Sequence, residues 1–332
     1  MKPLELTIEI NELQILLNKF EDYDCTFPVF PQFKLFKAFP VDSGYEIRLD
    51  HLDFDQFYTG FNDMNLEFPV YNDFKECFLA SGCISYDNTD QFTKKYNMSN
   101  NFHKKPYLAL DTNILYHRFI SFSPYSDQKV LVSPTILQEI EHSINFKYNP
   151  SQIQELKKVI KVRKHLFNEL TNCRVKKSRK AAYFAMNEWK TINSIKVDPI
   201  NYNSNAYERN DLKIIKEFKN FQKETETSVI VLTADRTMID FCIMEDVEYF
   251  LFYYPQKINI DQVSAHKFRN LIFNLAAIFG FIQLNSTIIY GEYQGKKGYN
   301  TLKIRFLDKK IFQAFNKDLQ ICRSLNKLNL EF

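Results

Sequence analysis

The stretch YLALDTNILY, Tyr107–Tyr116, places a carboxylate directly after a run of apolar residues. Residues 107–110 have the composition of a strand buried on both faces of a parallel sheet, since such strands are nearly continuous apolar runs. Asp111 follows at once, although a carboxylate is costly to bury unless something pairs with it. The stretch therefore predicts a core strand that ends on a functional group.

The same alternation continues along residues 106–258. Apolar β-rich runs are separated by helical patterns, and the predicted strands are 107–110, 129–132, 228–232 and 248–254. Such alternation is typical of a parallel sheet covered by helices on both faces. Ser133 and Pro134 form an N-cap and first-turn pair for one helix, and Asn210 is the predicted cap of another. Residues 106–260 contain no glycine, which excludes a P-loop or a GxGxxG loop there.

Four acids are predicted at one edge of this sheet. Asp111 and Asp235 follow strands, and Glu139 and Asp211 lie near the beginnings of helices. Ligands of open α/β sheets bind beyond the carboxyl ends of the strands. Carboxylates about 4 Å apart repel by about 4 kcal/mol, so such a cluster needs a cation. Oxygen ligands without nearby histidine or cysteine favour Mg²⁺ or Mn²⁺ over zinc. Each acid alone is also typical of a turn or a helix cap.

The order strand-DTN, helical Glu, helical Asp, strand-TAD resembles the PIN domain family of metal-dependent ribonucleases, over about residues 107–256. The most specific pieces are LALDTNIL (108–115) and VIVLTADRTM (229–238). The resemblance implies a three-layer α/β/α sandwich with a mainly parallel central sheet, and hydrolysis of RNA or sometimes structured DNA. It also implies site residues: Asp111, Glu139, Asp211 and Asp235 as catalytic, metal-binding acids, with Asn113 and Thr233 as supporting polar groups. A DxDxT phosphotransferase is disfavoured, because Asn113 stands where its second Asp is needed.

A basic run is the candidate for holding substrate. Residues 156–180 contain ten Lys/Arg and one acid. If they form a helix, Lys157, Lys161 and Lys164 make a basic ridge along a phosphate backbone, with Val162 facing inward. A solvated helix and a contact with an acidic part of the chain are the alternatives. Two further side chains near the acids are assigned by their position: Arg236 to substrate binding, and His117 to a helix surface or packing, with a phosphate contact as its alternative.

Composition and charge suggest three domains. Residues 1–105 form an acidic, mixed α+β domain with 10 Lys/Arg against 17 Asp/Glu. The remainder has 33 against 23, and this basic excess is an electrostatic footprint for a polyanion. The polar stretch 96–106 is the predicted linker to a PIN-like domain at 106–258. Residues 259–332 are predicted as a helix, hairpin and helix extension of α+β type.

These observations lead to one functional expectation with two alternatives. We expect an Mg²⁺- or Mn²⁺-dependent endoribonuclease that uses a metal-activated water. The alternatives are a catalytically inactive RNA-binding or assembly subunit and, less favoured, a structure-specific DNA nuclease. Expected partners are single-stranded RNA, a protein bound by the acidic domain, and a second copy of the chain. The six cysteines show no CxxC pair, and no run is apolar enough for a membrane helix, so a reduced cytoplasmic protein is expected.

Overall fold

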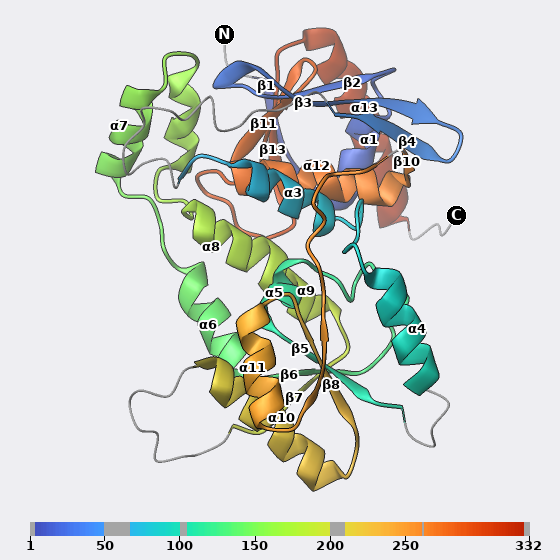
Figure 1. Cartoon of the computed structure of the whole chain (residues 1–332). Coiled ribbons are helices and arrows are strands. Elements are labelled where there is room, and N and C mark those ends of the chain that lie inside the picture. Colours follow the sequence, from blue (N-terminus) through green and yellow to red (C-terminus); the bar gives the residue numbers. More distant parts are fainter. Residues whose placement is uncertain (1–3, 50–66, 100–104, 200–209, 261, 329–332) are drawn as a thin grey trace. The chain divides into compact units, whose positions relative to one another are not determined.

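The computed structural model describes residues 4–49, 67–99, 105–199, 210–260 and 262–328 (Figure 1). The chain forms two compact units. The first comprises Met1–Cys83, Phe146–Arg179 and Asn259–Phe332, and the second comprises Ile84–Asn145 and Lys180–Ile258. Each unit therefore contains segments that are distant in the sequence, which differs from the predicted division at residues 105 and 258.

The second unit is built on a parallel sheet of five strands in the order β7-β6-β5-β8-β9. The strands are β5 (Tyr107–Leu110), β6 (Val130–Val132), β7 (Ser194–Lys196), β8 (Val229–Thr233) and β9 (Glu248–Leu251). Four of them are the predicted strands, and β7 was not predicted. The strand order reverses between β5 and β8, and such a switch point opens a crevice at the carboxyl ends of the strands.

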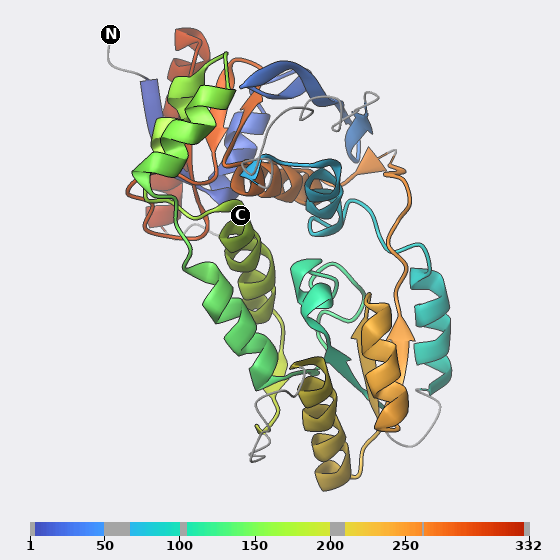
Figure 2. The same ribbon diagram turned by 60° about the vertical axis from the view of Figure 1, so that its left-hand side comes forward.

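Helices cover this sheet on both faces. They are α4 (Thr89–Ser99), α5 (Thr112–Tyr116), α6 (Pro134–Ile144), the π-helical turn η4 (Ala181–Ala185), α9 (Met186–Thr191), α10 (Asn210–Thr225) and α11 (Arg236–Met244). Helix α5 contacts η4, α9 and β8, whereas α10 and α11 contact each other and β8. Right-handed connections on the two sides of the switch point place these sets on opposite faces. The predicted α/β/α fold is confirmed (Figure 2).

The start of α6 shows how the sequence sets these elements. Ser133 is its N-cap, and the Ser133 hydroxyl accepts hydrogen bonds from the backbone of Thr135 and Ile136. Pro134 occupies the first turn, where no backbone donor is needed. Ile136, Ile140 and Ile144 are buried at helical spacing. The helix therefore begins as predicted and holds its later residues at the edge of the sheet.

The first unit contains an antiparallel sheet of eight strands in the order β1-β13-β12-β11-β2-β3-β4-β10. The strands are β1 (Leu4–Glu9), β2 (Tyr23–Phe27), β3 (Phe30–Val41), β4 (Gly44–Arg48), β10 (Gln262–Val263), β11 (Phe281–Leu284), β12 (Thr287–Tyr290) and β13 (Thr301–Phe306). Strands β1 and β13 pair along their lengths, with Leu4 opposite Phe306. Segments near the two ends of the chain thus share one sheet. The predicted separation into an N-terminal domain and a C-terminal extension does not hold for this sheet.

Helices of this unit also refine the predictions. Their bounds are η1 (Ile10–Glu12), α1 (Leu13–Leu17), α3 (Tyr71–Leu79), α7 (Pro150–Val159), η3 (Lys164–Leu170), α8 (Lys176–Lys180), α12 (Ala265–Phe279) and α13 (Lys309–Lys327). Ser264 caps α12, so this helix begins later than the predicted residue 261, which lies outside the described residues. Asp308 caps α13 by accepting a hydrogen bond from the backbone of Lys310 at 2.7 Å. The predicted linker begins within α4, and its residues 100–104 also lie outside the description.

The basic run does not form one helix. Helix α7 ends at Val159, and Ile160 is extended and buried. Arg163 then adopts a left-handed conformation (φ 51°) before the 3-10 helix η3. Lys161 lies between the two helices and Lys164 begins the second, so the predicted continuous ridge is wrong. Val162 is 44% exposed instead of facing inward, because the chain leaves the helix before it.

Candidate active site

The carboxylate of Asp111 is the central feature of the second unit. Asp111 follows β5 directly, is 3% exposed and acts as the N-cap of α5. The backbone of Thr112 donates to Oδ1 at 2.6 Å. Oδ2 accepts from the Thr233 hydroxyl at 2.7 Å and from the Asn113 amide at 3.3 Å. Three donors from both sides of the switch point therefore fix the orientation of this buried carboxylate.

Burial disfavours the charged form of this group. It raises the pKa of Asp111 to about 6, against the lowering effect of hydrogen bonds from Thr233, Thr112 and Asn113, and the negative charge of Asp211 raises the pKa further. At neutral pH the carboxylate is thus ionised at an energetic cost. A cation bound beside it would offset that cost.

This raised pKa predicts a pH-dependent stability. The unfolded chain has the ordinary value of 3.8, so between the two pKa values the folded protein binds more protons and loses stability as the pH rises. We expect Asp111→Asn to remove this loss. In EDTA, the free energy of unfolding of the wild type, relative to the variant, should fall by about 1 kcal/mol between about pH 5 and pH 7. Urea unfolding at both pH values measures the difference, and a constant difference would contradict it.

Thr233 connects the ends of β8 and β9 to Asp111. Its hydroxyl is buried and accepts from the backbone of Asp235 at 2.9 Å while it donates to Asp111. Its carbonyl accepts from the backbone of Phe252 at 2.8 Å. Asp235 lies two residues further on, half-buried, and caps α11 by accepting from Thr237 at 2.9 Å. One carboxylate oxygen of Asp235 is therefore engaged at a helix start, which is the alternative role considered for it.

Glu139 is joined to this edge by two polar neighbours. The Thr112 hydroxyl donates to Oε2 at 3.4 Å, and the Asn210 amide donates to Oε1 at 2.7 Å. Asn210 is the first residue of α10, and its predicted capping role stays a prediction. Asp211 is the next residue, in the first turn of α10. A polar chain therefore runs from α5 through α6 to α10.

A second buried acid, which was not predicted, lies behind this chain of polar contacts. Glu217 on α10 is 1% exposed and accepts hydrogen bonds from the hydroxyls of Ser133 and Thr135, the latter at 3.0 Å. It ties α10 to the start of α6. The signal was present, because Glu217 lies in the buried stripe of α10 three residues after Ile214. An acid at such a position needs donors from a neighbouring element.

The donor chemistry of this edge fits a hard divalent cation. Every group is an oxygen ligand, and burial disfavours the ionised form of Asp111, which a nearby positive charge would stabilise. Direct coordination of one ion by several acids would require their side chains to converge. Among the residues that the structure describes, no group of three or more His, Cys, Asp or Glu is placed to hold a metal ion. Oxygen ligands supplied through water or by a substrate phosphate are compatible with this spacing.

The predicted substrate-binding residues fall in different units. Arg236 is exposed at the first position of α11, directly after Asp235. Lys157, Lys161 and Lys164 belong to the first unit. Lys161 and Lys164 are exposed and Lys157 is partly so. Only Arg236 therefore shares a compact unit with the four acids.

The fold and this edge define an α/β protein with a buried carboxylate, Asp111, at the switch point of its parallel sheet. Residues 108–248 match the family model of the PIN domain, which confirms the resemblance for this segment. The match spans segments of both compact units. PIN domains have a nuclease-type fold, commonly bind nucleic acids and generally use divalent metal ions. No curated protein matches the chain. In the described residues, no helix combines the length and apolarity that crossing a membrane requires.

Proposed function

We propose that the protein is a divalent-metal-dependent endoribonuclease. The observation that supports this best is Asp111, a buried carboxylate at the switch point of a PIN-type sheet, held by three donors. Its burial raises its pKa, so the site favours a bound cation. The Thr112 hydroxyl links Glu139 to the Asp111 segment, and the negative charge of Asp211 raises the pKa of Asp111. These acids are the proposed binding site for Mg²⁺ or Mn²⁺, together with Asp235.

The chain's own residues would orient the reacting groups. A bound divalent ion supplies acidity to a water molecule and neutralises charge on the phosphate. Thr233 and Asn113 orient the Asp111 carboxylate by donating hydrogen bonds to its Oδ2. Asn210 orients the Glu139 carboxylate by donating to its Oε1. Such supporting hydrogen bonds fix the direction in which a carboxylate presents its free electron pairs. Arg236 is exposed beside Asp235, where its charge suits a substrate phosphate.

Cleavage of labelled single-stranded RNA tests the proposal. With Mn²⁺ or Mg²⁺ we expect fragments that carry 5′-phosphate ends, and with EDTA we expect intact RNA. Duplexes, hairpins and flaps of DNA in parallel reactions distinguish an RNA nuclease from a structure-specific DNA nuclease. Equal cleavage in EDTA would contradict a metal-dependent mechanism.

The second candidate is a PIN-fold RNA-binding or assembly subunit without turnover. The observation that favours it is the lack, in the described residues, of a group of three metal-holding side chains. Thermal unfolding separates the two functions. An ion that binds at 100 times its Kd raises the free energy of unfolding by about 2.7 kcal/mol. A nuclease should show such a rise with Mn²⁺ that Asp111→Asn removes, whereas an inactive subunit should show RNA binding and no rise.

The basic residues of the first unit remain a predicted contact for RNA phosphates. Replacing Lys157, Lys161 and Lys164 together with alanine should weaken binding and reduce the salt dependence of log K by about 2, because fewer counterions are released. Fluorescence anisotropy at several salt concentrations measures this slope. A matched control removes the same charge from exposed lysines of α13, namely Lys309, Lys310 and Lys317. Equal slopes for both triple variants would show that only net charge matters.

A further inference from the structure

The segment after β9 is held by the loop that precedes α4. Strand β9 ends at Leu251, earlier than the predicted residue 254. The Asn88 side chain then accepts from the backbone of Tyr253 at 2.9 Å and donates to the Leu251 carbonyl at 2.8 Å. The backbone of Asp87 donates to the Tyr253 carbonyl at 3.0 Å. These bonds follow the last contact with β8, from Phe252 to the Thr233 carbonyl, and they hold the backbone of Tyr253 in place.

A cluster of aromatic and polar side chains packs against this segment. The Tyr254 hydroxyl and the Tyr86 hydroxyl contact the two ring nitrogens of His117, which is 3% exposed. A neutral imidazole satisfies both contacts by donating from one nitrogen and accepting at the other. The ring of Tyr86 stacks on Phe252 with centroids 4.6 Å apart. His117 is therefore a packing residue, as expected, and it fixes the wall of a pocket.

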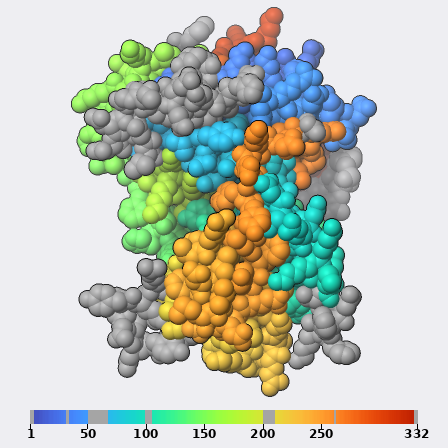
Figure 3. All heavy atoms as spheres, viewed as in Figure 1, coloured from blue at the N-terminus to red at the C-terminus, as the bar shows by residue number. Residues whose placement is uncertain are grey.

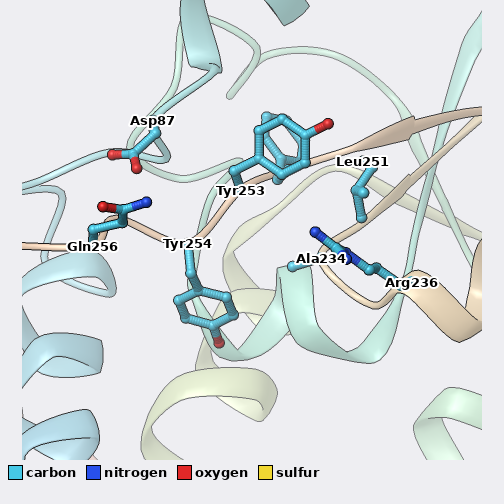
Figure 4. Close-up of a pocket in the computed structure, with 8 residues that line it drawn as sticks. Asp87, Ala234, Arg236, Leu251, Tyr253, Tyr254 and Gln256 are labelled. Atoms are coloured by element: carbon cyan, nitrogen blue, oxygen red, sulfur yellow. The ribbon is translucent and has the colours of Figure 1, made fainter.

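Tyr253 presents its ring on the other side of the segment. Neighbouring residues of an extended chain point to opposite sides, and Figure 4 shows the rings of Tyr253 and Tyr254 directed away from each other. Tyr253 is 50% exposed. In Figure 3 this part of the chain, coloured orange, lies on the surface facing the viewer. A large aromatic side chain is thus fixed by its backbone yet left half open to solvent.

Two adjoining cavities share this residue. One has a volume of about 520 Å³ and the other about 410 Å³, and both are lined by Arg236, Leu251 and Tyr253. The shared lining offers an aromatic face, an aliphatic side chain and a guanidinium group. Arg236 directly follows Asp235, and the Thr233 carbonyl accepts from Phe252 in the segment itself. The residues that line the cavities are therefore neighbours, in sequence or by a hydrogen bond, of Asp235 and Thr233 at the acidic edge.

We propose that Tyr253 and Arg236 form a subsite for one unpaired base of a nucleic acid strand, with the base stacked on the Tyr253 ring and its phosphate held by Arg236. This inference rests on the proposed function for its ligand class. Aromatic rings bind bases of any sequence through their π-faces, and guanidinium groups pair with phosphate. Bases within a duplex are already stacked on one another, so the subsite selects a single strand over a duplex.

Binding to RNA in EDTA tests the subsite without requiring cleavage. We expect Tyr253→Ala to weaken the affinity of the full chain for a short single-stranded RNA by about tenfold, and Tyr253→Phe to stay within about twofold. Affinity for a duplex of the same sequence should not change with either substitution. Phe146→Ala is the matched control, because Phe146 is 47% exposed and lines neither cavity. Anisotropy gives the affinities, and thermal unfolding shows whether each variant is folded.

Each outcome has a definite meaning. Unchanged affinity of folded Tyr253→Ala overturns the subsite, as does an equal loss for single strand and duplex or an equal loss in the Phe146 control. If Tyr253→Phe fails as Tyr253→Ala does, the hydroxyl and not the ring is needed, and stacking is also overturned. A selective loss in Tyr253→Ala together with no cleavage under any divalent ion leaves the subsite standing and removes only the nuclease activity.

Discussion

Asp111→Asn is expected to lower kcat/KM for metal-dependent RNA cleavage by more than about a hundredfold. A bound metal ion contributes several kcal/mol to stabilising the charge that grows on a phosphate in the transition state. The substitution keeps the size of the side chain and one acceptor oxygen, but it removes the charge that would hold the ion. The amide has a single acceptor oxygen, so either Thr112, which donates to Oδ1, or Thr233 and Asn113, which donate to Oδ2, lose their acceptor. Initial rates with saturating Mn²⁺ measure the loss.

A matched control separates loss of the site from loss of charge alone. Asp127 is exposed and lies before β6, at the opposite edge of the sheet from Asp111. Asp127→Asn should therefore cleave RNA at the rate of the wild type. Asp111→Asn should also unfold in EDTA near the temperature of the wild type, because removal of the buried charge offsets the lost acceptor. Full activity of the folded Asp111 variant would reject the proposed site.

Local signals account for what the sequence predicted correctly. The apolar run before Asp111, the Ser133–Pro134 pair before α6 and the apolar run before Thr233 each specify an element from neighbouring residues. In a parallel sheet those elements bring their carboxyl ends to one edge, so the positions of the acids followed from the strand pattern. Asn113 and Thr233 do contact Asp111, although their role beside a metal remains a prediction.

Long-range pairing accounts for what the sequence did not reveal. The ends of the chain join through β1 and β13, and Leu4 and Phe306 carry no local sign that they are partners. The short strand β7 has only three residues and is partly exposed, so it gives no strong apolar run. The subsite at Tyr253 depends on Asn88, which lies far away in the sequence and contacts the chain on both sides of Phe252. Such contacts appear only when the fold is known.

The basic run, residues 156–180, shows that a charge pattern alone does not predict which charged side chains are exposed. Its composition suggested a solvent-facing ridge, but the run contains Arg179, one of the largest fully buried side chains in the described residues. The Arg179 guanidinium donates to the carbonyl of Ile278 through Nε at 3.2 Å and Nη2 at 2.9 Å, and to the carbonyl of Arg174 at 2.9 Å. Nη1 also lies 3.3 Å from the Tyr148 hydroxyl. This arginine therefore joins two segments of the first unit instead of binding phosphate.

Arg179→Ala is expected to destabilise the first unit by about 3–5 kcal/mol. Removing the guanidinium takes the Arg179 donor from the carbonyls of Arg174 and Ile278 and opens a cavity beside Tyr148. Hydrogen exchange of the amides in α12 reports on this unit and should become faster by the corresponding factor. Lys177→Ala removes an exposed charge two residues away and should change the stability by no more than about 0.5 kcal/mol. Arg179 differs from the exposed Lys177 by the contacts of its guanidinium with carbonyl oxygens. Equal exchange rates in both variants would therefore mean that these contacts do not stabilise the unit.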